Sequence, residues 1–438
     1  MTSEQIASLE PALRRLLEKF AHCFEDRRTR SHWQKYVLGL LSDVPRKSIE
    51  PIALAAGVAV RTLQEFLSQH RWDHERAEAT LQRLVADEHG TSEAMGVIDS
   101  CGHPKQGRKT PGVQRQWCGE TGKVDNCVVG QHLLYTDNAG GNPFSCLVAS
   151  DLYLPRSWAR DRSRRREAGI PEGLAFRPKW QIAVDQVARA VGQGVRFSWL
   201  VFDEEYGRVP AFWRALDRLG QRTVGEVPSD FSCWATPPVC QSLRAEHEAK
   251  EVRHLARYSP VFRNQPWRTV TVKTTTRERV RLRVKAARVQ MVAEAHDHRR
   301  APSVPTDRRY WLIVTEHVRT GERKYWVSNA SAATEVGEML TAALARWHIE
   351  KWFERAKQQA GFGAFEVRTY RSLIRHWLSS RLAMFFLARE TRRLRGEKSA
   401  DHAGTGGRRG QQRGLETVAS HAEQLGSAAG VRSVSSAA

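Results

Sequence analysis

The sequence predicts an α/β fold, in which a mixed sheet flanked by helices is interrupted by a β-rich insertion and preceded by an all-α domain. Residues 1–92 carry apolar side chains at helical spacing. From residue 93, short apolar runs alternate with helical segments, which is typical of a layered sheet with some parallel pairing. Residues 226–332 change to alternating apolar and polar positions, the pattern of half-buried strands.

The helical region 1–92 contains a candidate helix-turn-helix. Residues 46–73 read as a helix, a short break at Gly57 and a second helix that begins near Arg61. Small residues before the break allow the two helices to approach closely, as a helix-turn-helix requires. An ordinary helical hairpin fits the same pattern equally well. The residues that would face a DNA groove are Arg61, Gln64, Ser68 and Gln69.

The next region supplies the strands and helices of the expected sheet. Strands are expected within 95–100, within 113–136 as a pair joined by a turn at 119–123, within 144–154 and within 197–207. Helices are expected over 179–194 and 211–220, each closed by glycine. The Arg-rich stretch 156–179 is expected to be a surface loop or a short helix. After the insertion, helical sequence runs from 333 to 395, and the low-complexity tail 396–438 is expected to be disordered.

The charge of the chain indicates its class of partner. Lys and Arg outnumber Asp and Glu by 69 to 48, which gives a formal net charge of +21. A positive field of this size attracts polyanions, so nucleic acid is the expected partner. A solvated basic surface without a specific partner is the alternative interpretation of the same composition.

The cysteines and the apolar runs indicate a reducing compartment and no membrane anchor. The seven cysteines are scattered and include no Cys-x-x-Cys pair, which argues against a disulfide framework and a structural zinc site. No apolar run approaches the roughly 20 residues needed to cross a bilayer. Residues 1–17 are typical of an amphipathic helix rather than a signal peptide. We therefore expect a cytoplasmic protein without membrane contact.

Three carboxylates are candidates for catalysis. Asp99 and Asp203 each end an apolar strand, and Glu350 lies in the helix expected after residue 346. A buried carboxylate without a partner is costly, so such positions favour a ligand. Acids on neighbouring strands would suit Mg²⁺, and a pair of such ions can activate water and stabilise the leaving oxygen of a phosphodiester. Taken singly, each acid has the alternative role of a helix cap or turn former.

Neighbouring acids compete for the same assignments. Glu204 adjoins Asp203, but strand alternation points it to the opposite face and favours Asp203 as the inward residue. Glu354 lies one turn after Glu350 and has an alternative role as a surface partner for Lys351 or Lys357.

Four blocks resemble the DDE transposases of bacterial insertion sequences, in the group whose RNase H-like catalytic domain is interrupted by a β-strand insertion before the glutamate helix. The blocks are "VIDSCGHPKQGRKTPGVQRQWCGETGKVDNCVVG", "DLYLPRSWARDRSRRREAGIP", "FSWLVFDEEYG" and "RWHIEKWFERAKQQAGF" with its continuation. Together they span about residues 30 to 390. The resemblance implies a helical DNA-binding domain at 1–92, a catalytic domain split into 93–225 and 333–395, and an insertion domain at 226–332.

The resemblance also implies roles for single residues. Asp99, Asp203 and Glu350 would be both the catalytic residues and the ligands of two Mg²⁺ ions, with Mn²⁺ as an alternative ion. Arg346 and Lys357 match family positions that line the DNA cleft, and helix geometry places them on the side of Glu350. They would contact phosphates of the DNA. A tyrosine that many relatives carry before the arginine is replaced by Ala343.

The function implied is DNA transposition. Such an enzyme binds terminal inverted repeats, cleaves at the element ends and joins the freed 3′-hydroxyl to target DNA. Its partners would be double-stranded transposon ends and target, held by a homodimer, in the bacterial cytoplasm and associated with the nucleoid. Two alternatives stay open. One is a non-catalytic DNA-binding protein derived from a transposase. The other is a related RNase H-fold nuclease without strand transfer, such as a defence enzyme or a guide-directed enzyme.

Overall fold

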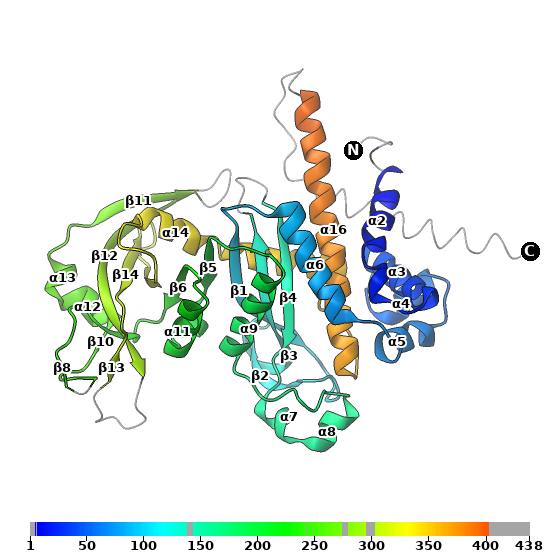
Figure 1. The fold of residues 1–438 in the computed structure, drawn as a ribbon, viewed down its shortest axis with the longest axis horizontal. Helices are drawn as coiled ribbons and strands as arrows, with labels where there is room; N and C mark the ends of the chain where they lie inside the picture. Colours follow the sequence, from blue (N-terminus) through cyan, green and yellow to red (C-terminus); the bar gives the residue numbers. More distant parts are fainter. Residues whose placement is uncertain are drawn as a thin grey trace, which may run out of the picture.

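The computed structural model describes residues 5, 7–137, 143–241, 243–273, 279–294 and 303–402. These residues form one large mixed sheet flanked by helices, with a group of N-terminal helices at one end and the β-rich insertion at the other (Figure 1). The predicted α/β class with an all-α N-terminal region is therefore confirmed. The disorder predicted for the tail falls on 403–438, which lie outside the described residues.

The N-terminal region is helical, as predicted. Its elements are α2 (Leu9–Glu18), η1 (Ala21–Cys23), α3 (Arg27–Leu41), α4 (Ile49–Ala55), α5 (Val60–Ser68) and α6 (His74–His89). Asp26 and Asp73 begin α3 and α6 as N-caps, since their carboxylates accept hydrogen bonds from backbone N–H groups of the first turn. Gly57, with φ +61°, allows the tight turn between α4 and α5. The two helices are therefore joined by a short, sharp turn.

The central sheet contains the strands predicted within 95–100, 113–136, 144–154 and 197–207, together with β6. They are β1 (Met95–Pro104), β2 (Gln114–Cys118), β3 (Lys123–Thr136), β4 (Ser145–Leu152), β5 (Trp199–Phe202) and β6 (Thr223–Val227). β3 lies between β1 and β4 and is antiparallel to both, while β5 is parallel to β1 and β6 is parallel to β5. The spatial order β4–β3–β1–β5–β6 is that of an RNase H-like sheet, and β2 pairs with the first residues of β3.

The insertion extends this sheet and does not form a sheet of its own. Its elements are β7 (Ser232–Trp234), β8 (Cys240–Gln241), β9 (Arg244–Ala245), β10 (Lys250–Glu251), α12 (Val252–Tyr258), α13 (Pro260–Arg263), β11 (Arg268–Lys273), β12 (Arg279–Glu294), β13 (Val304–Pro305), β14 (Tyr310–His317) and β15 (Arg323–Ser328). β15 pairs antiparallel with β6, so the hydrogen-bonded ladder continues from the central strands into the insertion. Only β8 and β9 pair apart from it among the described strands.

The remaining helices cover the sheet and connect it to the N-terminal region. They are α7 (Arg156–Arg160), α8 (Arg162–Glu167), α9 (Lys179–Gly192), α10 (Glu204–Gly207), α11 (Pro210–Arg218), α14 (Val336–Leu344), α15 (Trp347–Ala360) and α16 (Tyr370–His402). α16 runs beyond residue 396, where the tail was predicted to begin. The division into separate domains stays a prediction.

The N-terminal helices dock on α16 through buried polar contacts. The Arg375 guanidinium donates to backbone carbonyls of Phe66, Leu67, His70 and Trp72, at and just beyond the end of α5. Its side chain is 2% exposed. The Tyr36 hydroxyl lies 2.8 Å from the His376 ring. A buried guanidinium of this kind orients the candidate helix-turn-helix relative to the C-terminal helix.

The cysteine side chains form no disulfides in the described structure. All seven cysteines are free, and only Cys240 is exposed. Of the helices in the described ranges, none combines the length and the apolar character needed to cross a membrane.

Candidate active site

Asp99 and Asp203 lie on neighbouring parallel strands, but only Asp203 stands at a strand end: it follows β5 directly, whereas β1 continues past Asp99 to Pro104, so the predicted strand-end position of Asp99 is wrong. The register between β1 and β5 pairs Val97 with Val201. Extended by two residues, the same register brings Asp99 level with Asp203. Both carboxylates therefore lie at the edge where β5 ends and β1 runs on, near enough for Asp203 to raise the pKa of Asp99.

The Asp99 carboxylate is largely buried, with its side chain 15% exposed. One oxygen accepts a hydrogen bond from the backbone N–H of Ser100 at 2.7 Å. The other lies 3.3 Å from a guanidinium nitrogen of Arg346. Burial and the neighbouring Asp203 carboxylate raise the pKa of Asp99 to about 7, while Arg346 acts in the opposite direction. This group therefore holds its proton up to near neutral pH unless a cation approaches.

Asp203 serves at the same time as a helix cap. It follows β5 directly and begins the short helix α10, with its Oδ1 accepting from the backbone N–H of Glu205 at 3.0 Å. Burial raises the pKa of Asp203, and the positive charge of Arg346 opposes this. The roles of helix cap and of candidate metal ligand are alternatives in the sequence analysis. Asp203 can fill both, because one carboxylate oxygen caps the helix and the second is left for a ligand.

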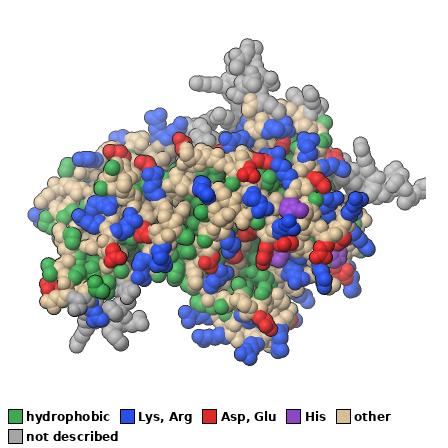
Figure 2. All heavy atoms as spheres, viewed as in Figure 1, with side chains coloured by type: hydrophobic (Ala, Val, Ile, Leu, Met, Phe, Trp, Pro, Cys, Tyr) green, Lys and Arg blue, Asp and Glu red, His purple; other side chains and the backbone are tan. Residues whose placement is uncertain are grey.

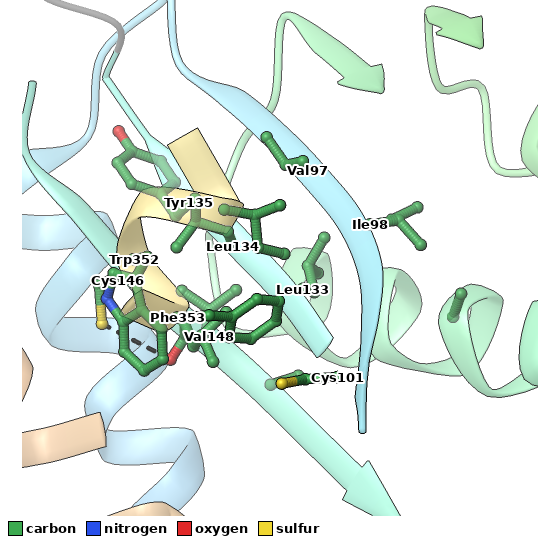
Figure 3. Packing of buried hydrophobic residues seen from close by; sticks show 14 of the residues in the cluster. Val97, Ile98, Cys101, Leu133, Leu134, Tyr135, Cys146, Val148, Trp352 and Phe353 are labelled. Carbon is green, nitrogen blue, oxygen red and sulfur yellow. Dashed lines mark hydrogen bonds between the residues drawn. The ribbon is translucent and has the colours of Figure 1, made fainter. Parts of the chain in front are cut away.

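Helix α15 presents Glu350 toward these strands. The helix packs on the sheet through Trp352 and Phe353, which lie against β3 and β4 side chains such as Leu133 and Val148 (Figure 3). The Glu350 side chain remains 57% exposed and accepts a hydrogen bond from Arg346 at 2.7 Å. The Arg346 guanidinium thus bridges Asp99 and Glu350.

The donors fit a divalent cation chemically, but their arrangement differs from the predicted metal centre. Carboxylate oxygens are the ligands that Mg²⁺ prefers, and two adjacent buried carboxylates gain from a cation between them. In the described part of the chain, however, no group of three or more His, Cys, Asp or Glu is placed so that it could hold a metal ion. Arg346 pairs with both Asp99 and Glu350, so its positive charge lies between these two carboxylates.

Lys357, the other predicted cleft residue, lies on the same helix. Its amine pairs with the Glu120 carboxylate at 2.6 Å, and its side chain is 26% exposed. Glu120 belongs to the turn between β2 and β3. Arg346 and Lys357 are therefore both present at this edge of the sheet, and both are paired with carboxylates in the described structure.

Comparisons with known proteins agree with this geometry. The family model described as DDE superfamily endonuclease matches residues 19–309. The chain belongs to the DDE superfamily of endonucleases. The match includes Asp99 and Asp203 and ends before helix α15.

Two further similarities accompany the family match. A probable transposase for insertion sequence element IS701, from Microchaete diplosiphon, is 28% identical over 209 residues, which are 47% of this chain and 51% of that protein. The chain thus matches about half the length of this curated relative. A piggyBac transposase synaptic complex with hairpin DNA aligns with a TM-score of 0.45 and 10% identity, covering 94% of this chain and 74% of that one.

Several polar residues of this DDE endonuclease surround the acids although the sequence analysis did not single them out. Gln131 on β3 donates to the backbone carbonyl of Asp99 at 3.2 Å and accepts a hydrogen bond from the Tyr206 hydroxyl. Because Tyr206 lies on α10, these contacts tie the residues after Asp203 to strand β1. No local pattern could have indicated them, since Gln131 and Tyr206 meet only in the folded sheet.

A second ion pair lies next to Asp99. Lys179, the first residue of α9, contacts the Glu205 carboxylate at 2.7 Å and the Ser100 hydroxyl at 3.2 Å. No pattern in the sequence connects these residues. They add a cation and an acid to the edge of the sheet that carries Asp99 and Asp203.

The competing acids have other environments. Glu354 pairs with Lys351 at 2.7 Å, the surface role named as its alternative. Strand alternation was the reason for preferring Asp203 over Glu204, and that reason is wrong. β5 ends at Phe202 and Glu204 begins helix α10, so Glu204 is not part of a strand. Glu204 is exposed, whereas Asp203 is partly buried.

Of the predicted groove-facing residues, Arg61, Gln64 and Ser68 lie on α5, and Gln69 directly follows it. Arg61 and Gln64 are exposed, and the opposite side of α5 buries Leu63, Phe66 and Leu67. Arg61 pairs with Glu65 on its own helix at 2.7 Å. The outward face of α5 is thus polar and accessible.

Proposed function

We propose that this DDE endonuclease is a DNA transposase that binds terminal inverted repeats, cleaves the phosphodiester at the element ends and joins the resulting 3′-hydroxyl to target DNA. The observation that carries the proposal is the pair Asp99 and Asp203, level on adjacent parallel strands, with the pKa of both raised. Similarity to a probable transposase supports the same reaction class.

The residue roles follow from the contacts. Asp99 and Asp203 would hold divalent cations between them, and Glu350 would join them from helix α15. When bound, such ions activate the attacking water or hydroxyl and stabilise the leaving oxygen. Arg346, released from its carboxylate partners, would pair with a DNA phosphate. Lys357 would act similarly after leaving Glu120.

DNA recognition is assigned to exposed cationic and polar surfaces. The net charge of +21 attracts the backbone, and the outward face of α5, with Arg61 and Gln64, would read base edges. Two element ends must be held together for joining, so a homodimer on DNA is part of the proposal.

The test is a reaction with Mg²⁺ on DNA that carries the repeats bordering the gene, with an unlabelled plasmid as target. Wild-type protein should cut at the repeat boundary and give strand-transfer products, and Asp203→Asn should bind the DNA but give neither product. Cutting without any joined product would favour a nuclease of the same fold. Binding without cutting by the wild type would favour a regulator and would contradict the proposal.

A further inference from the structure

The β2–β3 hairpin carries an aromatic side chain that is largely exposed to solvent. Trp117 is 62% exposed, and it is the only tryptophan among the exposed large hydrophobic residues of the described chain. The register places it opposite Val124, which is 53% exposed. The other face of the hairpin is packed, with Cys118 and Cys127 fully buried. The hairpin is therefore stabilised by one face and presents an apolar pair on the other.

The tryptophans of the insertion differ from Trp117 in this respect. Trp234 and Trp326 are buried, and their indole N–H groups donate to protein oxygens. Trp267 lies beneath the cationic groups of Arg283 and Lys285. These rings are engaged in intramolecular packing, whereas the ring of Trp117 is exposed to a partner.

Cationic side chains lie on both faces of the hairpin: Arg115 shares the face of Trp117, whereas Lys123, paired with Cys118, belongs to the other face. Arg115 and Lys123 on the hairpin are exposed. The hairpin is joined to the adjacent helix α7 by a hydrogen bond from Ser157 to Gln114 at 2.7 Å. Lys and Arg side chains gather over α7 and α8 at the lower end of the molecule (Figure 2). The exposed cations of this basic lobe are Arg108, Lys109, Arg156, Arg160, Arg162 and Arg166.

The hairpin is attached directly to the candidate active site. Its turn is held to helix α15 by the ion pair between Glu120 and Lys357. Its β2 strand packs on β1 so closely that a Cβ on Gly102 would lie 2.9 Å from the Cys118 sulfur. Gly102 follows Asp99 by three residues on the same strand. Trp117 pairs with Val124, which by alternation shares a face of β3 with His132, the partner of Asp99 in the β1–β3 register, so a ligand on Trp117 would lie on the same face of the sheet as Asp99.

We infer that the β2–β3 hairpin and the basic lobe bind the DNA next to the cleavage site, and that Trp117 stacks on a nucleobase there. This inference rests on the proposed function. The partner is chosen by charge complementarity: a partner with a flat apolar surface and a dense negative charge fits an exposed indole among cations, and DNA has both. Stacking requires a base whose face is accessible, so the base would be unpaired or partly unstacked near the cut.

The test compares Trp117→Ala with Trp117→Phe, which keeps an aromatic ring. The DNA probes are a fluorescent duplex with the repeat end and the same duplex with unpaired bases at the cleavage position. For the unpaired probe, Trp117→Ala should weaken binding by about tenfold, whereas Trp117→Phe should retain most of the affinity. The matched control is Tyr258→Ala, which removes another exposed ring, 52% accessible, on α12 in the insertion; it should leave the affinity unchanged.

A second readout separates stacking from charge. The double variant Arg115→Ala, Lys123→Ala should reduce the salt dependence of binding, because fewer counterions are released, while Trp117→Ala should leave the slope as in the wild type. Equal affinity of wild type and Trp117→Ala for the unpaired probe, with normal cleavage, would overturn the inference and leave the transposase proposal intact. Absence of DNA binding by the wild type would overturn both.

Discussion

Arg346 and Asp99, 247 residues apart in the sequence, form an ion pair of 3.3 Å between helix α15 and strand β1. The guanidinium also contacts Glu350, so one positive charge partly neutralises the acidic edge of the sheet. In the proposed reaction a divalent cation would take over this electrostatic role, and Arg346 would become available to DNA. The pH dependence, the ligand roles and the docking of the N-terminal helices can each be tested.

Cleavage should depend on the ionisation of Asp99. Burial and Asp203 raise the pKa of Asp99 to about 7 from an ordinary value of 3.8. A protonated carboxyl binds a cation poorly, so at subsaturating Mg²⁺ the cleavage rate should rise as pH increases through 7. A rate that is flat over this window, measured with DNA binding held at saturation, would contradict the assignment.

The raised pKa of Asp99 also determines how the free energy of unfolding changes with pH. The folded-state pKa of Asp99 lies above its unfolded value, so the folded protein keeps the proton longer. This contribution to the free energy of unfolding is complete below about pH 4 and is lost as pH rises through about 7. Replacing Asp99 with Asn should remove this part of the pH dependence in denaturant titrations without metal.

Glu350 and Glu354 offer a matched comparison on one helix. Both are about half exposed, at 57% and 52%, and each pairs at 2.7 Å with a cation of the same helix. Glu350→Gln should lower the cleavage rate by about 100-fold or more, equivalent to roughly 2.7 kcal/mol of transition-state stabilisation. Glu354→Gln should leave the rate within about twofold of the wild type, since it loses only a surface pair. Similar losses in both variants would indicate an effect on the helix and not on catalysis.

The sequence could predict the central strands because each is a short apolar run, and Asp99 and Asp203 because each ends such a run. It could not predict that β15 joins β6, which makes the insertion part of the central sheet, since strand pairing at this separation has no local signal. For the same reason it assigned Arg346 only through a resemblance, and the contact with Asp99 emerged from the fold.

Local rules also failed at particular positions. Strand alternation was applied beyond Phe202, where the chain already turns into α10. The exposure of the Trp117 ring could not be recognised from the sequence, because it depends on which side of the hairpin is covered in the fold. Site residues that end an apolar run could thus be found from the sequence. Residues whose role depends on contacts with other strands or helices could not.

The N-terminal helices should depend on Arg375 for their attachment to α16. Replacing Arg375 with Ala leaves several buried carbonyls near the end of α5 without their donor. We expect a loss of about 3 kcal/mol in the free energy of unfolding, measured by urea titration. Arg371→Ala, an exposed arginine of the same helix, should cost less than about 0.5 kcal/mol. Equal stability of the two variants would refute the docking role.

Sequence-specific binding should depend on the outward face of α5. Arg61→Ala and Gln64→Ala should each weaken binding to repeat DNA by about tenfold and reduce discrimination against scrambled DNA. The matched control is Arg14→Ala on α2. The Arg14 side chain is similarly exposed, at 79% against 84% for Arg61. Each arginine pairs with a glutamate four residues away on its own helix. If all of these variants bind alike in competition assays, α5 does not read the DNA.

The central claim is that Asp99 and Asp203 share a divalent cation, and a calorimetric titration with Mn²⁺ tests it most directly. Wild-type protein should bind Mn²⁺ at pH 8, and Asp99→Asn and Asp203→Asn should each weaken that binding at least about tenfold, as expected for the loss of a charged ligand. Glu354→Gln should titrate like the wild type. Unchanged Mn²⁺ affinity in both aspartate variants would show that the acids do not form a metal site.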